Sequence, residues 1–235
     1  MSENLLKKYG QPLVYRAINP FISLLVRWKV KPNTITTIGL LINASAAAIF
    51  IYGAEYGARN DHSYIGWGGV VILFAGLFDM VDGRLARVSN MSSPFGALYD
   101  SVLDRYSEMI MFLGICWYLV AQSYFFSSLF AFIALIGSVM VSYIRARAEG
   151  LGAQASVGLM QRPERVILIG FSAVACGIFS ATVGGDVKIV KDWWPIPVFE
   201  TISIFTLPIV VLAILTNLTA ISRLIHSKNE LEGKS

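Results

Sequence analysis

The chain has 235 residues and a formal net charge of +4; 55% of its residues are hydrophobic and 14% are charged. Its mean hydropathy of +0.62 lies outside the range of soluble globular domains and indicates an integral membrane protein. The small positive charge is accounted for by basic residues at segment ends, so it predicts no nucleic-acid partner.

The first 31 residues predict an amphipathic helix on the membrane surface. Apolar residues such as Leu5, Leu13 and Phe21 are interleaved with basic ones such as Lys7 and Arg16, a pattern typical of a helix that lies on an anionic leaflet. Basic residues interrupt the apolar run, so no cleavable signal peptide is expected. We divide the chain into this helix at 1–31, a transmembrane domain at 32–227 and a tail at 228–235.

Six later segments are apolar and long enough to cross the hydrocarbon core, which needs about 20 residues in a helix. The expected spans are 33–55, 66–88, 94–121, 124–148, 164–184 and 197–223. The predicted fold class is therefore an all-α integral membrane protein with six transmembrane helices preceded by an amphipathic interfacial helix.

Basic residues divide the segment ends into two sides. One side of the predicted bundle carries most of the basic residues: Lys7, Lys8, Arg16, Arg27, Lys29, Lys31, Arg84, Arg87, Arg145, Arg147, Arg162, Arg165, Arg223, Lys228 and Lys234. The opposite side has only Arg59, Lys188 and Lys191. Because basic residues concentrate in cytoplasmic loops, we expect both termini on the cytoplasmic side of a bacterial-type inner membrane. The Trp193–Trp194–Pro195 run suits an aromatic belt at the opposite interface.

The cysteines and histidines predict no further chemistry. Cys116 and Cys176 fall in the middle of spans, where small buried side chains are expected. His62 and His226 have no neighbouring ligand pattern, which argues against zinc. The sequence has no dinucleotide fingerprint, P-loop or Gly-x-Ser-x-Gly elbow.

Four aspartates lie within apolar sequence, two in the second span and two in the third: Asp79, Asp82, Asp100 and Asp104. An ionised carboxylate at membrane depth costs about 2.5–3.5 kcal/mol unless it is compensated. A single one can pair with a nearby arginine, but four in one short stretch indicate a bound cation. Oxygen ligands suit Mg²⁺, and four carboxylates can hold two ions against a diphosphate.

The spacing places these acids on one face of each helix. Residues three or four apart share a helix face, so one stripe contains Gly76, Asp79, Gly83 and Ala86 and the other contains Gly96, Asp100 and Asp104. Because small residues let helix backbones approach closely, we expect the second and third spans to pack directly against each other. The acids are expected to line a pocket open to the cytoplasm.

The motif Asp-x-x-Asp-Gly-x-x-Ala-Arg-(x8)-Gly-x-x-x-Asp-x-x-x-Asp, at 79–104, resembles the signature of the CDP-alcohol phosphotransferases at every fixed position. The resemblance covers nearly the whole chain, because that family has an amphipathic N-terminal helix followed by six transmembrane helices. It implies Mg²⁺ or Mn²⁺ as cofactor, two ions, a CDP-diacylglycerol-type lipid and a small polar alcohol as substrates, and a homodimer with the third and fourth spans as candidate faces.

The resemblance also assigns roles to residues. It implies that Asp79, Asp82 and Asp100 bind metal and that Asp104 is the general base and a further metal ligand. Gly83 and Arg87 are expected beside the CDP moiety. The element Pro32-Asn33-x-x-Thr36, or the adjacent Thr34, resembles the family's Pro-Asn-x-x-Thr element near the nucleotide.

Basic residues at the ends of the fourth, fifth and sixth spans indicate which alcohol is the acceptor. The chain resembles the phosphatidylinositol-phosphate synthase branch, in which a basic residue late in the fourth span, an arginine early in the fifth and one near the C-terminus bind the phosphate of inositol phosphate. The matching residues are Arg145, which stands where a lysine is usual, either Arg162 or Arg165, and Arg223. The expected function is transfer of a phosphatidyl group to inositol phosphate or inositol, with release of CMP.

Other readings remain open at this stage. Within the family, glycerol 3-phosphate would also use an arginine-lined pocket, serine would need carboxylate and ammonium recognition, and a CDP-alcohol could instead donate to diacylglycerol. A divalent cation transporter would distribute its acids along several helices at different depths. Here the acids cluster at one end, which favours an enzyme over a transporter or a structural scaffold.

Overall fold

The computed structural model describes the chain except residues 1–10, 60, 156, 159, 192–193 and 234–235. A short helix and six long ones, with one hairpin, make up the regular structure of the described residues. In chain order the elements are α1 Gln11–Arg27, α2 Pro32–Tyr56, α3 Ser63–Val88, α4 Pro94–Ala121, α5 Phe125–Glu149, α6 Arg162–Val183, β1 Lys188–Lys191, β2 Trp194–Glu200 and α7 Ser203–Leu231.

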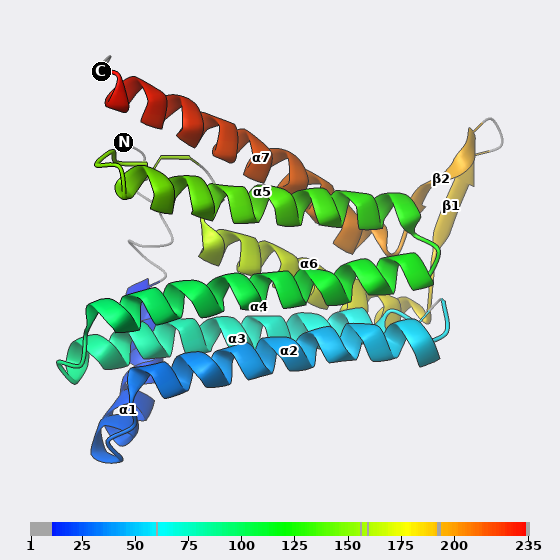
Figure 1. Cartoon of the computed structure of the whole chain (residues 1–235). Coiled ribbons are helices and arrows are strands. Elements are labelled where there is room, and N and C mark those ends of the chain that lie inside the picture. Colours follow the sequence, from blue (N-terminus) through cyan, green and yellow to red (C-terminus); the bar gives the residue numbers. More distant parts are fainter. Residues whose placement is uncertain (1–10, 60, 156, 159, 192–193, 234–235) are drawn as a thin grey trace.

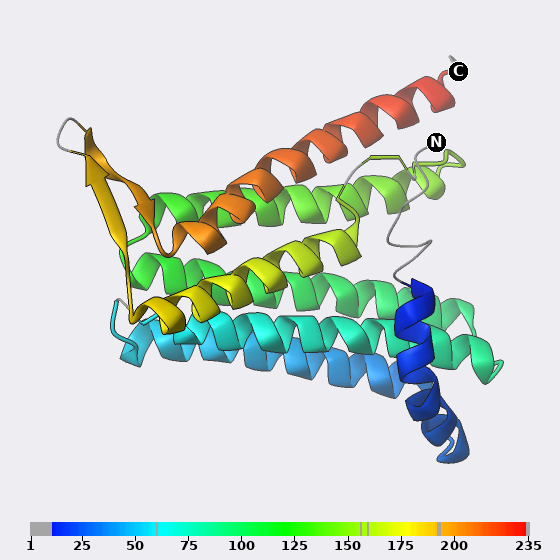
Figure 2. The same ribbon diagram turned by 180° about the vertical axis from the view of Figure 1, so that it is seen from behind.

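The six long helices form a closed ring. Close contacts join α2 to α3, α3 to α6, α6 to α7, α7 to α5, α5 to α4 and α4 back to α2. Figures 1 and 2 show these helices running along one common direction, with α1 crosswise at one end and the hairpin at the other. The fold class and the interfacial N-terminal helix are confirmed, and the hairpin is an addition to them.

Aromatic side chains fill the middle of the ring. Phe50, Phe112, Tyr118 and Phe205 are each at most 1% exposed, and the rings of Phe50 and Phe205 stack with centroids 6.1 Å apart. The outer surface is also apolar, since Trp67 and Phe171 are 64% and 62% exposed. An apolar exterior around a packed interior fits a bundle surrounded by lipid.

Five of the described helices are long and apolar enough to cross a membrane by length and composition. The sixth long helix, α4, has Asp100, Asp104, Arg105 and Glu108 among its first 15 residues of 28, so it is too polar to qualify by composition. It lies in the ring between α2 and α5 and completes the six-helix bundle.

The last expected span, 197–223, is placed wrongly. Its first residues belong to β2, which pairs antiparallel with β1 so that Lys188 lies opposite Glu200. The prolines at 195 and 197 disfavour a helix there, and α7 starts only at Ser203. The helix then continues to Leu231, into the stretch assigned to a tail, while Trp193 of the expected aromatic belt lies outside the described residues.

The expected direct packing of the second and third spans is also wrong. Within the described residues, α3 contacts α2 and α6 closely, but it has no comparable contact with α4. The small residues of α3 serve the contact with α6: a Cβ on Gly177 would lie 2.5 Å from the Cα of Gly66. Carboxylates on α3 and α4, with a guanidinium between them, need space that two touching backbones would not leave.

The N-terminal helix packs against the aspartate-bearing end of α3. Ile22 and Leu25 are buried together with Ile35, Val81 and Leu85. The residues expected at its beginning, including Leu5, Lys7 and Lys8, lie outside the described residues. The part of α1 that is described therefore covers α3 next to Asp82.

Candidate active site

Two helix ends and a short loop position the acids. Helix α3 ends at Val88, and a turn with Asn90 at φ 54° leads to Ser93. The Ser93 hydroxyl accepts a hydrogen bond from the Gly96 amide at 3.0 Å, and Pro94 fills the first turn of α4. A serine cap followed by proline is a favoured helix start, so the local sequence fixes where α4 begins and hence which way Asp100 points.

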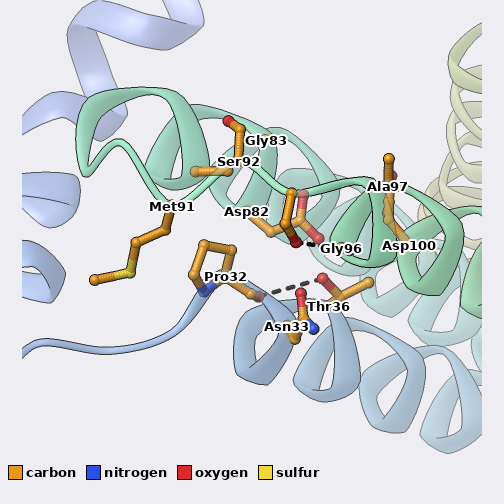
Figure 3. A pocket seen from close by; sticks show the side chains of 12 residues that line it. Pro32, Asn33, Thr36, Asp82, Gly83, Met91, Ser92, Gly96, Ala97 and Asp100 are labelled. Carbon is orange, nitrogen blue, oxygen red and sulfur yellow. Dashed lines mark hydrogen bonds between the residues drawn. The ribbon is translucent and has the colours of Figure 1, made fainter.

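A cavity of about 220 Å³ opens at this end of the ring. Figure 3 shows Asn33 and Thr36 of α2 on one side, with Asp82 and Gly83 of α3 and Asp100 of α4 around the rest. The cavity is also lined by Pro32, Ala86, Met91, Ser92, Ser93, Gly96 and Ala97. The predicted nucleotide element and the motif from α3 and α4 thus meet in one hollow.

Asp82 is the most buried of the four acids, with 5% of its surface exposed. The Thr36 hydroxyl, which lines the same cavity, donates to the Pro32 carbonyl oxygen at 3.2 Å. The Oδ2 oxygen of Asp82 is buried and has no hydrogen-bond partner among the described residues. A buried carboxylate oxygen without a partner is costly unless a ligand satisfies it, so Asp82 is suited to hold a cation.

The four carboxylates face a common space. Asp82 interacts electrostatically with Asp79 and Asp100, and Asp104 interacts with Asp79 and Asp100. Arg162, the first residue of α6, enters between them and forms ion pairs with Asp79 and Asp104, the latter at 2.9 Å. With this guanidinium in the space, no three acidic, histidine or cysteine side chains of the described chain gather closely enough to hold a metal ion by themselves.

The predicted CDP-binding residues lie around the cavity at different positions. Asn33, Thr36 and Gly83 line it, whereas Thr34 lines an adjoining hollow with Thr37 and Tyr99. The Arg87 side chain folds back along α3, and its Nε donates to the Gly83 carbonyl oxygen at 2.9 Å. Arg87 is thereby held at the motif glycine.

The four arginines expected to bind the acceptor phosphate differ in their surroundings. Arg145 is exposed and pairs with Glu149 at 2.8 Å. Arg165 is 1% exposed and bonds Glu108 through Nε and Nη2 at 2.7 and 2.9 Å. Arg223 is 3% exposed and donates to the carbonyl oxygens of residues 157 and 141. It nevertheless lies within electrostatic range of Arg145 and Arg165, so these three arginines form one cluster.

Glu108 was missed by sequence reasoning. It lies one helical turn after Asp104 on the same face of α4, and that spacing is the signal that could have found it. Its partner Arg165 is 57 residues away in sequence, and nothing in the pattern predicts this pairing.

Comparison with known proteins adds to this geometry. Residues 29–226 match the family model described as CDP-alcohol phosphatidyltransferase. The chain belongs to the CDP-alcohol phosphatidyltransferase family. The expected family is thereby confirmed, and this phosphatidyltransferase is an enzyme embedded in a membrane.

Relatives of this phosphatidyltransferase include the phosphatidylinositol phosphate synthase of Mycobacteroides abscessus, 32% identical over 188 residues that cover 79% of each chain. The archaetidylinositol phosphate synthase of Methanothermobacter thermautotrophicus is 32% identical over 169 residues, covering 72% of this chain and 77% of that one.

Solved structures of a further relative match the fold. The Mycobacterium tuberculosis phosphatidylinositol phosphate synthase with CDP-DAG bound has a TM-score of 0.71 and 26% identity, covering 90% of this phosphatidyltransferase and 94% of that chain. The same synthase in complex with manganese and citrate has a TM-score of 0.68 and 25% identity, with 89% and 88% covered.

Proposed function

We propose that this phosphatidyltransferase transfers the phosphatidyl group of a CDP-diacylglycerol-type lipid to inositol phosphate and releases CMP. The observation that carries the proposal is the cavity between α2, α3 and α4, in which Asn33, Thr36, Gly83 and two motif aspartates meet beside Arg162 and Asp104. Support comes from relatives and solved structures named phosphatidylinositol phosphate synthase. The cluster of Arg145, Arg165 and Arg223 suits an acceptor that itself carries a phosphate.

The four carboxylates supply the oxygen donors that divalent cations prefer, and in this structure Arg162 occupies the space between Asp79 and Asp104. Their oxygen donors suit Mg²⁺ or Mn²⁺, and the buried Oδ2 of Asp82 lacks a hydrogen-bond partner among the described residues. We assign Asp79, Asp82, Asp100 and Asp104 as ligands, for two ions. When bound, the ions would neutralise charge on the diphosphate.

The proposed reaction gives a specific role to each residue of the site. Gly83, Arg87, Asn33 and the threonines at 34 and 36 hold the cytidine diphosphate part. Asp104 accepts the proton from the acceptor hydroxyl while the hydroxyl oxygen forms a bond to the lipid-side phosphorus. The bond between that phosphorus and the CMP oxygen breaks, and CMP leaves.

Arg162 is the proposed direct contact of the acceptor phosphate, because it pairs with Asp104 at 2.9 Å and so lies beside the base. Arg145 is exposed and is proposed as a second contact. Arg165 is hydrogen-bonded to Glu108, and Arg223 to the carbonyl oxygen of residue 141. We propose that these two arginines contribute positive electrostatic potential to the site without contacting the phosphate.

The membrane arrangement stays a prediction in its details. Helix α1 and the last turns of α7 lie at the same end of the bundle as the ends of α2, α3 and α4 that line the cavity (Figure 1), and this is the end with most of the basic residues. We propose that this end is cytoplasmic, that the membrane is a bacterial-type inner membrane, and that the protein forms a homodimer through α4 and α5.

The test is CMP release by purified protein in detergent from CDP-diacylglycerol, with inositol 1-phosphate, inositol, glycerol 3-phosphate or serine as acceptor, with Mg²⁺ or EDTA. Release that requires both Mg²⁺ and inositol 1-phosphate is expected. Protein carrying Asp104→Asn provides the background rate. Release with glycerol 3-phosphate alone would replace the proposed acceptor, and EDTA-resistant release would remove the metal assignment.

A further inference from the structure

A buried ion pair lies directly behind the proposed active site. Glu108 of α4 and Arg165 of α6 are 4% and 1% exposed. Two bonds join them, from Arg165 Nε to Glu108 Oε1 at 2.7 Å and from Nη2 to Oε2 at 2.9 Å. This two-bond arrangement restricts the relative position of both helices more than a single contact does.

Stability alone does not explain such a pair. A buried ion pair costs desolvation on both sides, and apolar residues of similar volume often stabilise a protein as well or better. Buried charge pairs are better attested as devices that fix one particular geometry. We therefore ask which part of the structure the Glu108–Arg165 pair holds in place.

The pair sits one turn from the catalytic residues on both helices. Asp104 and Glu108 are four residues apart on α4, and Arg162 and Arg165 are three apart on α6. Arg162 forms an ion pair with Asp104 at 2.9 Å, while Arg165 is hydrogen-bonded to Glu108. Two acid–arginine contacts therefore join α4 and α6 in consecutive turns, and the deeper one consists of residues that the proposed reaction does not use directly.

Arg165 also fixes the backbone that leads into Arg162. Its Nη1 donates to the carbonyl oxygen of Met160 at 2.9 Å, and Met160 has φ 61°. The Gln161 amide donates to Glu164 Oε2 at 2.8 Å as part of a capping box. Arg165 thus links both α4 and the backbone before Arg162 to the start of α6.

We propose that Glu108 is a positioning residue: through its buried pair with Arg165 it sets the first turn of α6, so that Arg162 faces Asp104 and the acceptor phosphate. The inference rests on the proposed function, in which Arg162 contacts that phosphate. Glu108 touches neither substrate. Its effect reaches the reaction only by way of Arg162.

The test is a double-mutant cycle with steady-state kinetics in detergent. Glu108→Gln is expected to raise the KM for inositol 1-phosphate on the order of tenfold, because a displacement of a fraction of an ångström at a reacting contact has effects of this size. The KM for CDP-diacylglycerol should stay within about twofold, since Arg162 does not contact it in this scheme. In an Arg162→Gln background, Glu108→Gln should add no further change in the acceptor KM.

Two variants control for general damage. Glu108→Asp keeps the charge and should recover most of the acceptor KM. Glu55→Gln makes the same chemical change at an exposed residue of α2 whose carboxylate accepts from Trp117 Nε1 at 2.9 Å, and it should leave both KM values unchanged. A purely structural role for Glu108 would lower the amount of folded protein without raising the acceptor KM selectively, or would act equally in both backgrounds, and either result overturns the proposal.

Amide hydrogen exchange separates failure of this inference from failure of the proposed function. Glu108→Gln should speed exchange in the first two turns of α6 about tenfold or more while exchange in the middle of α2 stays unchanged. Wild-type protein that released no CMP with any acceptor would refute the function, and the exchange result would still decide the structural half of the inference. Unchanged exchange in α6 would refute the positioning role whatever the activity.

Discussion

The contact between Gly66 of α3 and Gly177 of α6 allows a substitution whose effect is set by backbone geometry. In Gly177→Ala the new Cβ would lie 2.5 Å from the Gly66 Cα and 3.0 Å from its amide nitrogen. Carbon atoms in contact are about 3.5–4.0 Å apart, so the helices must separate by roughly 1 Å. No rotamer change relieves this clash, because the neighbouring atoms belong to the main chain.

The net change in stability follows from two opposing terms. Overpacking costs about 1–3 kcal/mol, and a clash with main-chain atoms that cannot move aside lies in the upper part of that range, at about 2–3 kcal/mol. Alanine gains about 1 kcal/mol over glycine in a helix interior. We expect Gly177→Ala to lower stability by about 1–2 kcal/mol, which corresponds to a Tm lower by about 2–8 °C for a chain of this size. Tryptophan fluorescence during thermal unfolding in detergent measures this shift.

Gly76→Ala is the matched control on the same face of α3. Its Cβ would meet only the Val166 Cγ1 atom at 3.2 Å, which is the end of a side chain that can move slightly. The same gain in helix propensity then leaves this variant as stable as the wild type or slightly more so. If Gly177→Ala unfolded at the wild-type temperature or above, the close α3–α6 contact would be incorrect.

Three further substitutions probe the site and the opposite end of the bundle. Asp104→Asn should lower turnover by about 10²–10⁴-fold, as loss of a general base does, while CDP-diacylglycerol binding measured by calorimetry stays close to the wild-type value. Asp82→Asn should weaken Mn²⁺-dependent binding of that lipid about tenfold or more, because it replaces one charged oxygen ligand. His62→Gln should reduce the loss of thermal stability below pH 6.5, because burial lowers the pKa of His62 in the folded protein.

The sign of the histidine effect comes from proton linkage. Below about pH 6.5 the unfolded chain binds a proton that folded His62 resists, so stability falls as the pH drops through this range. Equal slopes for His62→Gln and wild type would contradict the assignment.

The outcomes that would overturn the two aspartate predictions differ. Parallel loss of lipid binding and turnover in Asp104→Asn would leave Asp104 with the role of metal ligand only and would remove it as the base. Mn²⁺-dependent binding that stays at the wild-type level in Asp82→Asn would remove Asp82 from the metal site.

Much of the bundle could be predicted from apolar segment lengths. The first span was expected at 33–55 and is Pro32–Tyr56, and the fifth was expected at 164–184 and is Arg162–Val183. Proline at the start of both helices marks these boundaries physically. The last span was misplaced because β2 is as apolar as a membrane helix, and hydropathy does not distinguish a strand from a helix in such a run.

The candidate site was predictable in its residues but not in its contacts. Motif spacing gave the acids of α3 and α4 and the nucleotide element of α2, which the structure gathers around one cavity. Motif spacing did not give the pairing of Arg162 with Asp79 and Asp104, because Arg162 lies 83 residues after Asp79 in the sequence. Helix order around the ring depends on which faces pack best, and small residues fit equally well against several partners.

The packing of α1 has a practical consequence for shortened versions of the protein. Ile22 and Leu25 cover Val81 and Leu85, which lie on either side of Asp82 in α3. Removing the interfacial helix would leave these apolar side chains facing detergent beside a buried carboxylate, and water would gain a route to it. A truncation for crystallisation or for a soluble fusion should therefore retain the chain from Ile18 onward and should not begin at Pro32.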